Sequence, residues 1–132
     1  MILLDTSAIY ALASREDPRH REALRILERV RREGLDLILH TFVLAEAFAL
    51  LHRRRGLPVA LRMAADIRGI EIVAVDRPLA DRAVEWLGAN RRTRVSLVDA
   101  VSFIVMRDRR IRRVFAFDPD FENEGFEALS PG

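Results

Sequence analysis

Short runs of apolar residues alternate along the chain with longer stretches in which apolar residues recur at helical spacing. The apolar runs lie at residues 1–4, 35–39, 70–75 and 114–117, and a shorter fifth run lies at 126–129. Short runs rich in branched apolar residues, such as ILL at residues 2–4, are typical of strands buried on both faces of a parallel sheet. We therefore predict four strands and a short fifth one.

Helix start and stop residues punctuate the segments between these runs. Thr41, Asp76 and Ser96 are typical N-cap residues, and Gly34 and Gly56 are typical of helix ends. We expect helices at residues 6–14, 18–33, 41–55, 76–89 and 96–107, with a short additional helix that ends near residue 68. This alternation predicts an α/β protein, a three-layer sandwich around a mostly parallel central sheet of four to five strands.

Length and composition indicate a single domain that spans residues 1–132. Half of the 132 residues are hydrophobic, which argues against intrinsic disorder. The absence of cysteine excludes disulfides, thiolate metal sites and a cysteine nucleophile. No apolar stretch approaches the roughly 18 residues of a membrane span, and no basic leader precedes the first apolar run. We expect a cytoplasmic protein without a membrane partner.

The basic residues restrict the chemistry further. All 22 residues of the Lys+Arg class are arginines, so a P-loop lysine and a Schiff base are excluded. Arginine binds phosphates bidentately and stacks on bases, which favours a nucleic-acid partner. A GC-rich or thermophilic genome would give the same bias, and the net charge is only +2. Composition alone therefore leaves nucleic-acid binding open.

Four acidic residues stand apart from the arginine-rich segments. Asp5 and Asp118 follow the apolar runs ILL and VFAF. Glu46 and Asp99 are the only charged residues in TFVLAEAFALL and VSLVDAVSFIVM. Helical spacing places Glu46 and Asp99 on the same faces as apolar side chains, so we expect both to point toward the interior.

Clustered carboxylates call for a cation. Two carboxylates about 4 Å apart repel by roughly 4 kcal/mol at an effective dielectric constant near 20. Mg²⁺ and Mn²⁺ prefer carboxylate oxygens and water as ligands, so either ion turns this repulsion into binding. Because the C-terminal ends of parallel strands meet at one edge of a sheet, Asp5 and Asp118 are expected to converge there. The sequence favours a metal-centred acidic site.

Structural roles account for other polar residues and remain open for Asp5. Asp5 precedes a helix, so it is also a candidate N-cap residue. Asp76 in DRPLAD is interpreted as a helix cap, and Asp120 in DPDF as a turn residue in preference to an auxiliary ligand. The three histidines show no ligand spacing, and His40 is interpreted as a structural residue at a strand end.

The segments that carry the four acids resemble the PIN-domain ribonucleases, and most closely the VapC-type toxins of bacterial and archaeal toxin–antitoxin pairs. The resemblance rests, in chain order, on LLDTSAI, TFVLAEA, SLVDA and FDPDF, and it covers essentially the whole chain. It implies a PIN-like fold, a site that binds Mg²⁺ or Mn²⁺, and hydrolysis of RNA phosphodiesters by a metal-activated water. It also implies a cognate antitoxin as partner, and a homodimer.

The resemblance assigns roles to particular residues. The metal ligands that it implies are Asp5, Asp99 and Asp118. Glu46 would complete the catalytic site, as a ligand through water or by orienting the attacking water. The candidate RNA-binding residues are Arg53, Arg54, Arg55, Arg91, Arg92 and Arg94, although arginine runs of this kind are more often solvent-exposed faces than binding grooves.

The chain departs from the family pattern at one position. Many relatives carry Thr or Ser two residues before the last aspartate, where this chain has Ala116. We expect Thr6 or Ser7 to supply a hydroxyl in its place.

Other α/β classes fit less well. A receiver domain needs paired acids after its first strand and a late lysine, and this chain has neither. A haloacid-dehalogenase-like phosphatase needs a second aspartate two positions after Asp5, where Ser7 stands. A PIN domain that acts in RNA processing, or that binds RNA without cutting it, remains the alternative to a toxin.

Overall fold

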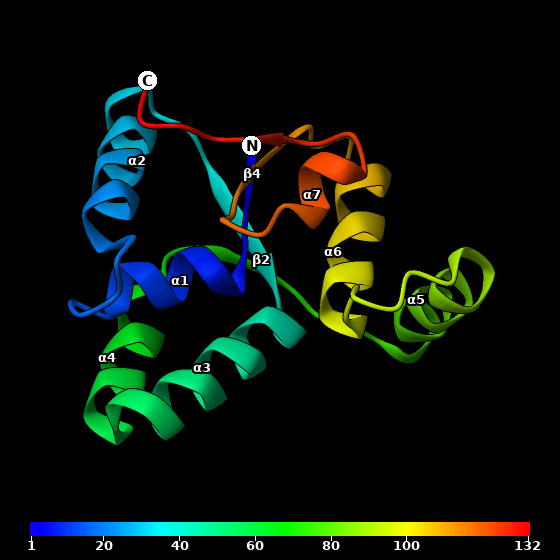
Figure 1. Ribbon diagram of the computed structural model, residues 1–132, viewed down its shortest axis with the longest axis horizontal. Helices are drawn as coiled ribbons and strands as arrows, with labels where there is room; N and C mark the ends of the chain where they lie inside the picture. The colour runs from blue at the N-terminus through cyan, green and yellow to red at the C-terminus, as the bar shows by residue number, and fades with distance from the viewer.

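Five strands form one sheet in the computed structural model, which describes residues 1–132 (Figure 1). The strands are β1 (Ile2–Leu4), β2 (Leu37–His40), β3 (Glu71–Val73), β4 (Arg113–Phe115) and β5 (Glu127–Ala128). They lie in the order β3-β2-β1-β4-β5, and every neighbouring pair is parallel. The predicted sheet of four to five strands is confirmed, and it is wholly parallel instead of mostly so.

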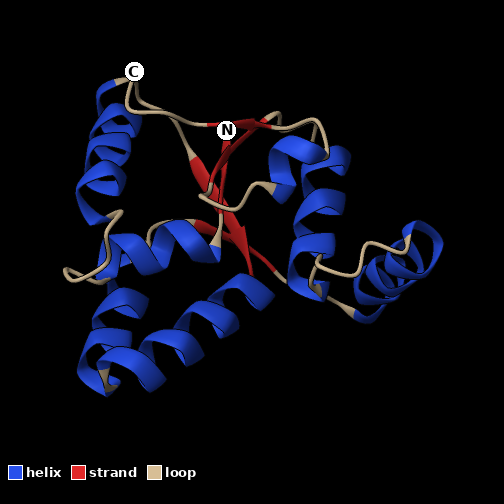
Figure 2. Cartoon of the chain, in the orientation of Figure 1, coloured by secondary structure: helices blue, strands red, loops and turns tan.

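Helices cover both faces of this sheet (Figure 2). One layer contains α1 (Thr6–Ala13), α2 (His20–Arg32), α3 (Thr41–Arg55) and α4 (Leu57–Asp66). The other contains α5 (Arg77–Asn90), α6 (Leu97–Asp108) and α7 (Asp120–Asn123). The predicted three-layer sandwich is confirmed. None of these helices combines the length and the apolar character needed to traverse a bilayer.

The strands divide their side chains between two apolar cores. Ile2 and Leu4 pack with residues of α1 to α4, whereas Leu3 packs with residues of α5 to α7. This division follows from the alternation of side chains along a strand. The second core is centred on Phe103 of α6, whose ring contacts the rings of Trp86, Phe121 and Phe126. The side chains of the run ILL therefore pack on both faces of the sheet, directly before Asp5.

The structure differs from the predicted elements mainly after β4. The strand ends at Phe115 instead of residue 117, because the Phe117 N–H donates to the Ser7 hydroxyl instead of continuing the ladder. The sequence pattern also does not predict α7, whose sequence DFEN has a single apolar residue. Phe121 of α7 is fully buried in the second core, so tertiary packing stabilises a helix that has no periodic signal of its own.

A buried histidine ties β2 to α3 and α6. His40 is fully buried, and its Nδ1 accepts a hydrogen bond from the Val43 N–H at the start of α3 (3.3 Å). Nε2 therefore carries the proton and donates it to the Ser102 hydroxyl of α6 (2.8 Å), which donates to the Val98 carbonyl (3.2 Å). Burial lowers the pKa of His40 to about 4, so the ring stays neutral at physiological pH. The interpretation of His40 as a structural residue is confirmed.

Replacing Ser102 with Ala should therefore destabilise the fold. We expect the free energy of unfolding to fall by about 1 to 3 kcal/mol, because the His40 Nε2–H would lose its acceptor in a buried site. Urea denaturation at pH 7 measures this loss, with Ser130→Ala at an exposed position as the control. Equal losses in the two variants would contradict the assigned hydrogen bond.

Candidate active site

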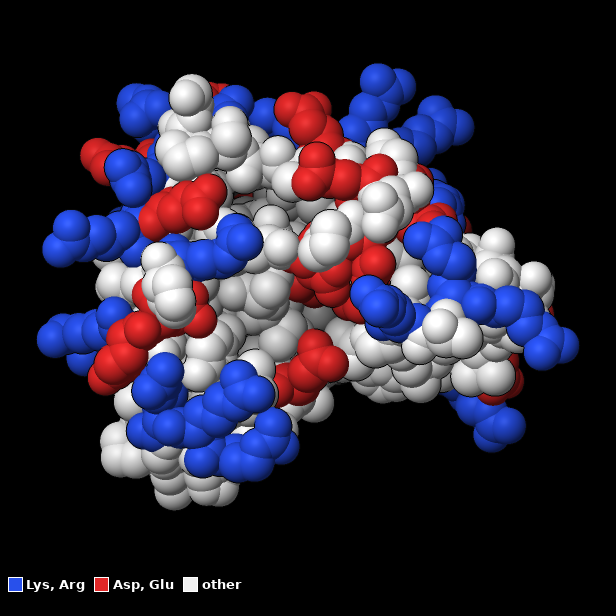
Figure 3. Space-filling view, viewed as in Figure 1, with Lys and Arg blue, Asp and Glu red and all other residues white.

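The ends of β1 and β4 meet at the C-terminal edge of the sheet. Asp5 follows β1 directly, and its N–H donates to the Phe115 carbonyl at the end of β4 (3.0 Å). The strand order reverses at β1, and the crevice at such a point is the usual ligand site of a parallel sheet. Figure 3 shows acidic side chains gathered near the middle of this view, with arginines on either side.

Asp5 caps α1 with one carboxylate oxygen and leaves the other free. Its Oδ2 accepts hydrogen bonds from the Ser7 N–H (3.2 Å) and the Ser7 hydroxyl (2.7 Å). Its Oδ1 is buried and has no hydrogen-bond partner. Burial raises the pKa of Asp5 to about 6 against the opposing effect of the Ser7 hydrogen bonds, and the charge of Asp118 adds to the rise. Asp5 is therefore a helix cap that also presents an unsatisfied oxygen.

Ser7 supplies a local hydroxyl close to Ala116, as expected of Thr6 or Ser7. The Ser7 Oγ donates to Asp5 and at the same time accepts a hydrogen bond from the Phe117 N–H (2.9 Å). It thus fixes the Asp5 carboxylate to the segment that follows β4. Thr6 is the other residue expected to supply a hydroxyl here, but its hydroxyl is buried and makes no hydrogen bond.

Asp99 is the acid whose pKa is raised by burial and by all three of the other predicted acids. It lies in the first turn of α6, is only 8% exposed, and donates its N–H to the Ser96 Oγ, which caps the helix (3.0 Å). Burial is the main reason that the pKa of this carboxyl rises to about 7. The negative charges of Asp5, Asp118 and Glu46 add to that rise. The charges of the other three predicted acids therefore all reach Asp99.

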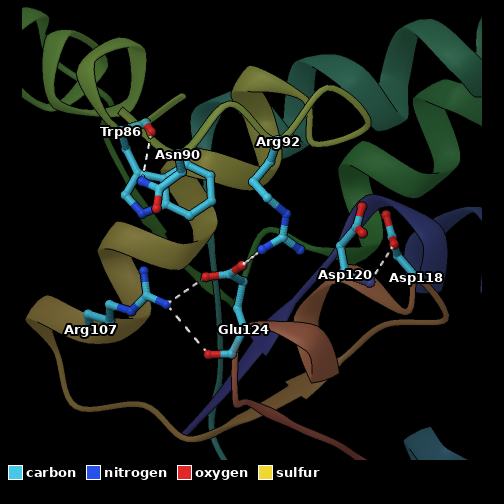
Figure 4. A network of polar contacts seen from close by, with 7 residues as sticks. All are labelled: Trp86, Asn90, Arg92, Arg107, Asp118, Asp120 and Glu124. Carbon is cyan, nitrogen blue, oxygen red and sulfur yellow. Dashed lines mark hydrogen bonds and ion pairs between the residues drawn. The ribbon is translucent and has the colours of Figure 1, made fainter. Parts of the chain in front are cut away.

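Asp118 and Asp120 form a tight group with Asp99. One carboxylate oxygen from each of the three residues lies within 4.8 Å of the other two. The Asp118 Oδ1 accepts the Asp120 N–H (2.9 Å) where the chain turns into α7 (Figure 4). Burial and the nearby Asp118 raise the pKa of Asp120, while Arg92 and Arg94 act in the opposite direction. The Asp120 N–H makes the turn that the sequence predicts for DPDF, and the Asp120 carboxylate also lies within this group.

Glu46 lies at the rim of the site and not in the interior. The buried face of α3 consists of Val43, Ala47 and Leu51. Glu46 lies off this face and is only partly buried, as is Phe42, one turn before it. The expectation that Glu46 points into the core is wrong because α3 is apolar on more faces than the protein buries. The carboxylate remains close enough to raise the pKa of Asp99.

The donor set fits a hard divalent cation. Three carboxylates share a small volume, and the buried Asp5 Oδ1 beside them lacks any partner. Burial and the neighbouring negative charges raise the pKa of Asp5 and Asp99, and a bound cation would relieve both effects. Carboxylate oxygens without nitrogen or sulfur ligands are the donors that Mg²⁺ and Mn²⁺ prefer.

The candidate RNA-binding arginines fall into two groups. The first ends α3, where Arg54 and Arg55 lie over the Tyr10 ring and Arg55 also contacts Glu16 (3.8 Å). The members of this group are Arg53, Arg54 and Arg55. The second group follows α5 and consists of Arg91, Arg92 and Arg94. Arg92 of this group lies beside Asp120 (Figure 4), and the charges of Arg92 and Arg94 both oppose the rise that burial causes in the pKa of Asp120.

One groove of the molecule lies away from these acids. It has a volume of about 1160 Å³ and is lined mainly by apolar residues, many of them from α1, α2 and α4. None of the four predicted acids contributes to its walls. The chemistry of the site therefore rests on the carboxylates at the sheet edge and not on this groove.

Comparisons with known proteins identify the family. The PIN domain profile matches residues 2–126. The chain is 38% identical, over 134 residues and 99% of each chain, to the 23S rRNA-specific endonuclease VapC20 of two Mycobacterium tuberculosis strains. The crystal structure of M. tuberculosis VapC20, a sarcin–ricin loop cleaving toxin, matches with a TM-score of 0.84 and 35% identity over 96% of both chains.

A second solved structure shares the fold at lower identity. FitAcB from Neisseria gonorrhoeae matches with a TM-score of 0.67 and 18% identity, over 99% of this chain and 98% of that one. Its likeness supports the fold alone. The profile match and the full-length similarity to VapC20 carry the assignment, and this chain belongs to the PIN-domain family.

Proposed function

We propose that the protein is a metal-dependent endoribonuclease and the toxin of a type II toxin–antitoxin pair. The observation that carries this proposal is the close group of Asp99, Asp118 and Asp120 carboxylates, next to which Asp5 keeps a buried oxygen without a hydrogen-bond partner. The relative VapC20 is an rRNA endonuclease, and the two chains align over nearly their full lengths. That alignment supports a toxin over a PIN protein of RNA processing.

The carboxylates have distinct tasks in this proposal. Asp5, Asp99 and Asp118 would hold Mg²⁺ or Mn²⁺, and Asp120 would join them. When bound, the cation supplies a Lewis acid that polarises the phosphate and lowers the pKa of water. Ser7 binds the Oδ2 of Asp5, so its Oδ1, which has no partner, would be available to the cation. Glu46 would complete the site, either as a ligand through water or by orienting the attacking water.

The similarity to VapC20 also suggests the first RNA to test. VapC20 cleaves the sarcin–ricin loop of 23S rRNA, so we propose a structured rRNA loop as the substrate class. The cytoplasm, where ribosomes are found, is the compartment that this substrate implies. We also propose a cognate antitoxin and a homodimer. Co-purification from the native operon and light scattering of the purified chain test these two partners.

Inducible expression with mapping of RNA 5′ ends tests the proposed function. The wild-type chain should generate new, discrete 5′ ends in rRNA and arrest growth, and the Asp5→Asn variant should do neither. Asn caps helices about as well as Asp, so this variant retains the cap of α1. Identical 5′ ends in both cultures would contradict the role of Asp5. Discrete cleavage without growth arrest would favour RNA processing.

The arginines after α5 are expected to contribute to RNA affinity through phosphate contacts. Binding by the Asp5→Asn variant should weaken linearly in log K against log salt concentration, with a slope of about −0.7 per phosphate contacted for single-stranded RNA. Replacing Arg91, Arg92 and Arg94 with Gln should make this slope shallower. The matched control replaces Arg21, Arg25 and Arg32 on the exposed side of α2. Equal slopes for both triple variants would mean that the segment after α5 does not contact the RNA and is only a solvent-exposed connector.

A further inference from the structure

We propose that Glu124 is a positioning residue that holds Arg92 beside the acidic site, where Arg92 binds a phosphate of the RNA. This inference rests on the proposed ribonuclease function and deepens it. Glu124 carries no signal in the sequence, because it lies among the mixed residues of DFENEG. Its role follows from the contacts of its two carboxylate oxygens.

Each oxygen of Glu124 contacts a different arginine (Figure 4). Oε2 accepts a hydrogen bond from Arg92 Nη1 (2.6 Å), and Oε1 accepts one from Arg107 Nη2 (3.1 Å). The Glu124 side chain is only 11% exposed, while those of Arg92 and Arg107 are 38% and 43% exposed. A carboxylate this sheltered, with both oxygens engaged, has little freedom to move.

Glu124 is anchored to rigid parts of the fold. Arg107 lies over the Phe126 ring (5.4 Å), and that ring stacks on the fully buried Phe103. The Glu124 N–H donates to the Asp120 carbonyl (3.1 Å), so α7 connects the two acids through a single helical turn. The element that places Asp120 in the acidic group therefore also places Glu124.

Arg92 lies between Glu124 and the acidic group. Figure 4 shows its guanidinium between the carboxylates of Glu124 and Asp120, and the charge of Arg92 acts on Asp120. A guanidinium has five N–H donors, so one contact with Glu124 leaves donors for a phosphate. Arg92, Arg107 and Glu124 together carry a net charge of +1. They provide a fixed positive group next to carboxylates that would otherwise repel the RNA backbone.

Positioning and simple electrostatics predict opposite effects when Glu124 loses its charge. Glu124→Gln makes the protein more positive by one charge, and long-range attraction alone would then tighten RNA binding. If Glu124 holds Arg92 in place, the same substitution should weaken binding, because the guanidinium is no longer fixed beside the site. The sign of the change therefore distinguishes the two.

The experiment compares Glu124→Gln with Glu33→Gln. Glu33 makes an ion pair of the same length with Arg29 (2.6 Å) on α2, so its replacement removes the same charge from an equivalent contact elsewhere. The probe is a synthetic sarcin–ricin-loop hairpin RNA. Its Kd is measured in the Asp99→Asn background, and KM and kcat are measured with Mg²⁺ in the otherwise wild-type chain.

We expect Glu124→Gln to raise Kd and KM by roughly 3- to 10-fold, which is the effect of losing one ordinary hydrogen bond, with a smaller change in kcat. Glu33→Gln should leave both constants unchanged or slightly lower. Arg92→Gln should reproduce the effect of Glu124→Gln, and the double variant should be no worse than Arg92→Gln alone, because the two residues act as a unit.

Two results would overturn the proposal. One is an RNA affinity of Glu124→Gln equal to that of Glu33→Gln, even if its melting temperature falls, since Glu124 would then be structural only. The other is a further loss of affinity when Glu124→Gln is added to Arg92→Gln. Failure of the proposed function would look different, because the wild-type chain with Mg²⁺ would not cleave the RNA.

Discussion

Replacing Asp99 with Asn is expected to lower kcat for RNA cleavage by about two to three decades, the usual effect of removing a group that stabilises charge in the transition state. Asp99 is buried and shares a small volume with the carboxylates of Asp118 and Asp120, and both its burial and the charges of the other acids raise its pKa. Its amide replacement keeps the shape but loses the negative charge. Initial rates on an end-labelled hairpin RNA with excess Mg²⁺ measure the change.

The matched control for this variant is Asp76→Asn. Asp76 caps α5 by accepting the Leu79 N–H (3.0 Å), as the sequence predicts, and does not belong to the acidic group. Its replacement should leave kcat within about twofold of the wild type, because Asn caps helices nearly as well. A loss below tenfold for Asp99→Asn would remove Asp99 from the active site.

Without metal, Asp99→Asn is expected to raise the melting temperature at neutral pH. The pKa of Asp99 is about 7 in the folded protein and near 3.9 in an unfolded chain. The folded state therefore binds the extra proton, and the wild type loses stability as the pH rises from about 4 to about 7. The loss is on the order of 2 to 4 kcal/mol, or about 5 to 10 °C, and the variant avoids it.

Melting curves in EDTA between pH 4 and pH 8 measure this difference. The wild type and Asp99→Asn should melt together near pH 4, separate as the pH rises, and differ by a constant amount above pH 7. The lowered pKa of His40 has the opposite effect, since it makes the protein less stable as the pH falls from 6.5 toward 4. His40 is present in both proteins, so this effect cancels in the difference. A pH-independent difference would contradict the raised pKa of Asp99.

Metal should reverse this order of stability. Mg²⁺ binds the folded site better than the unfolded chain, so it should stabilise the wild type by mass action and Asp99→Asn much less. Asp76→Asn should respond to Mg²⁺ as the wild type does.

Local patterns predict the elements that place Asp5 and Asp99. The run ILL is apolar because its side chains serve two cores, and this pattern is visible without a structure. Ser96 and Asp76 are helix caps whose residue types alone indicate helix starts, and both accept the expected hydrogen bond. The parallel sheet then brings the strand ends together, so the convergence of Asp5 and Asp118 is predictable from topology.

Features that depend on tertiary contacts could not be predicted. The helix α7 exists because Phe121 is buried against Phe103, which no local pattern encodes. Without α7, the sequence gives no reason to place Asp120 in the acidic group or Glu124 between two arginines. Glu46 shows the reverse problem, because an apolar helix does not reveal which of its faces the protein buries.

Cleavage of the sarcin–ricin-loop hairpin during removal and return of metal tests the central claim most directly. The wild-type chain should cut the RNA at a discrete position with Mg²⁺ or Mn²⁺, lose this activity in excess EDTA, and regain it when Mg²⁺ is restored. Asp5→Asn should be inactive under all three conditions. Full cleavage by the wild-type chain in excess EDTA would contradict a metal-dependent acidic site.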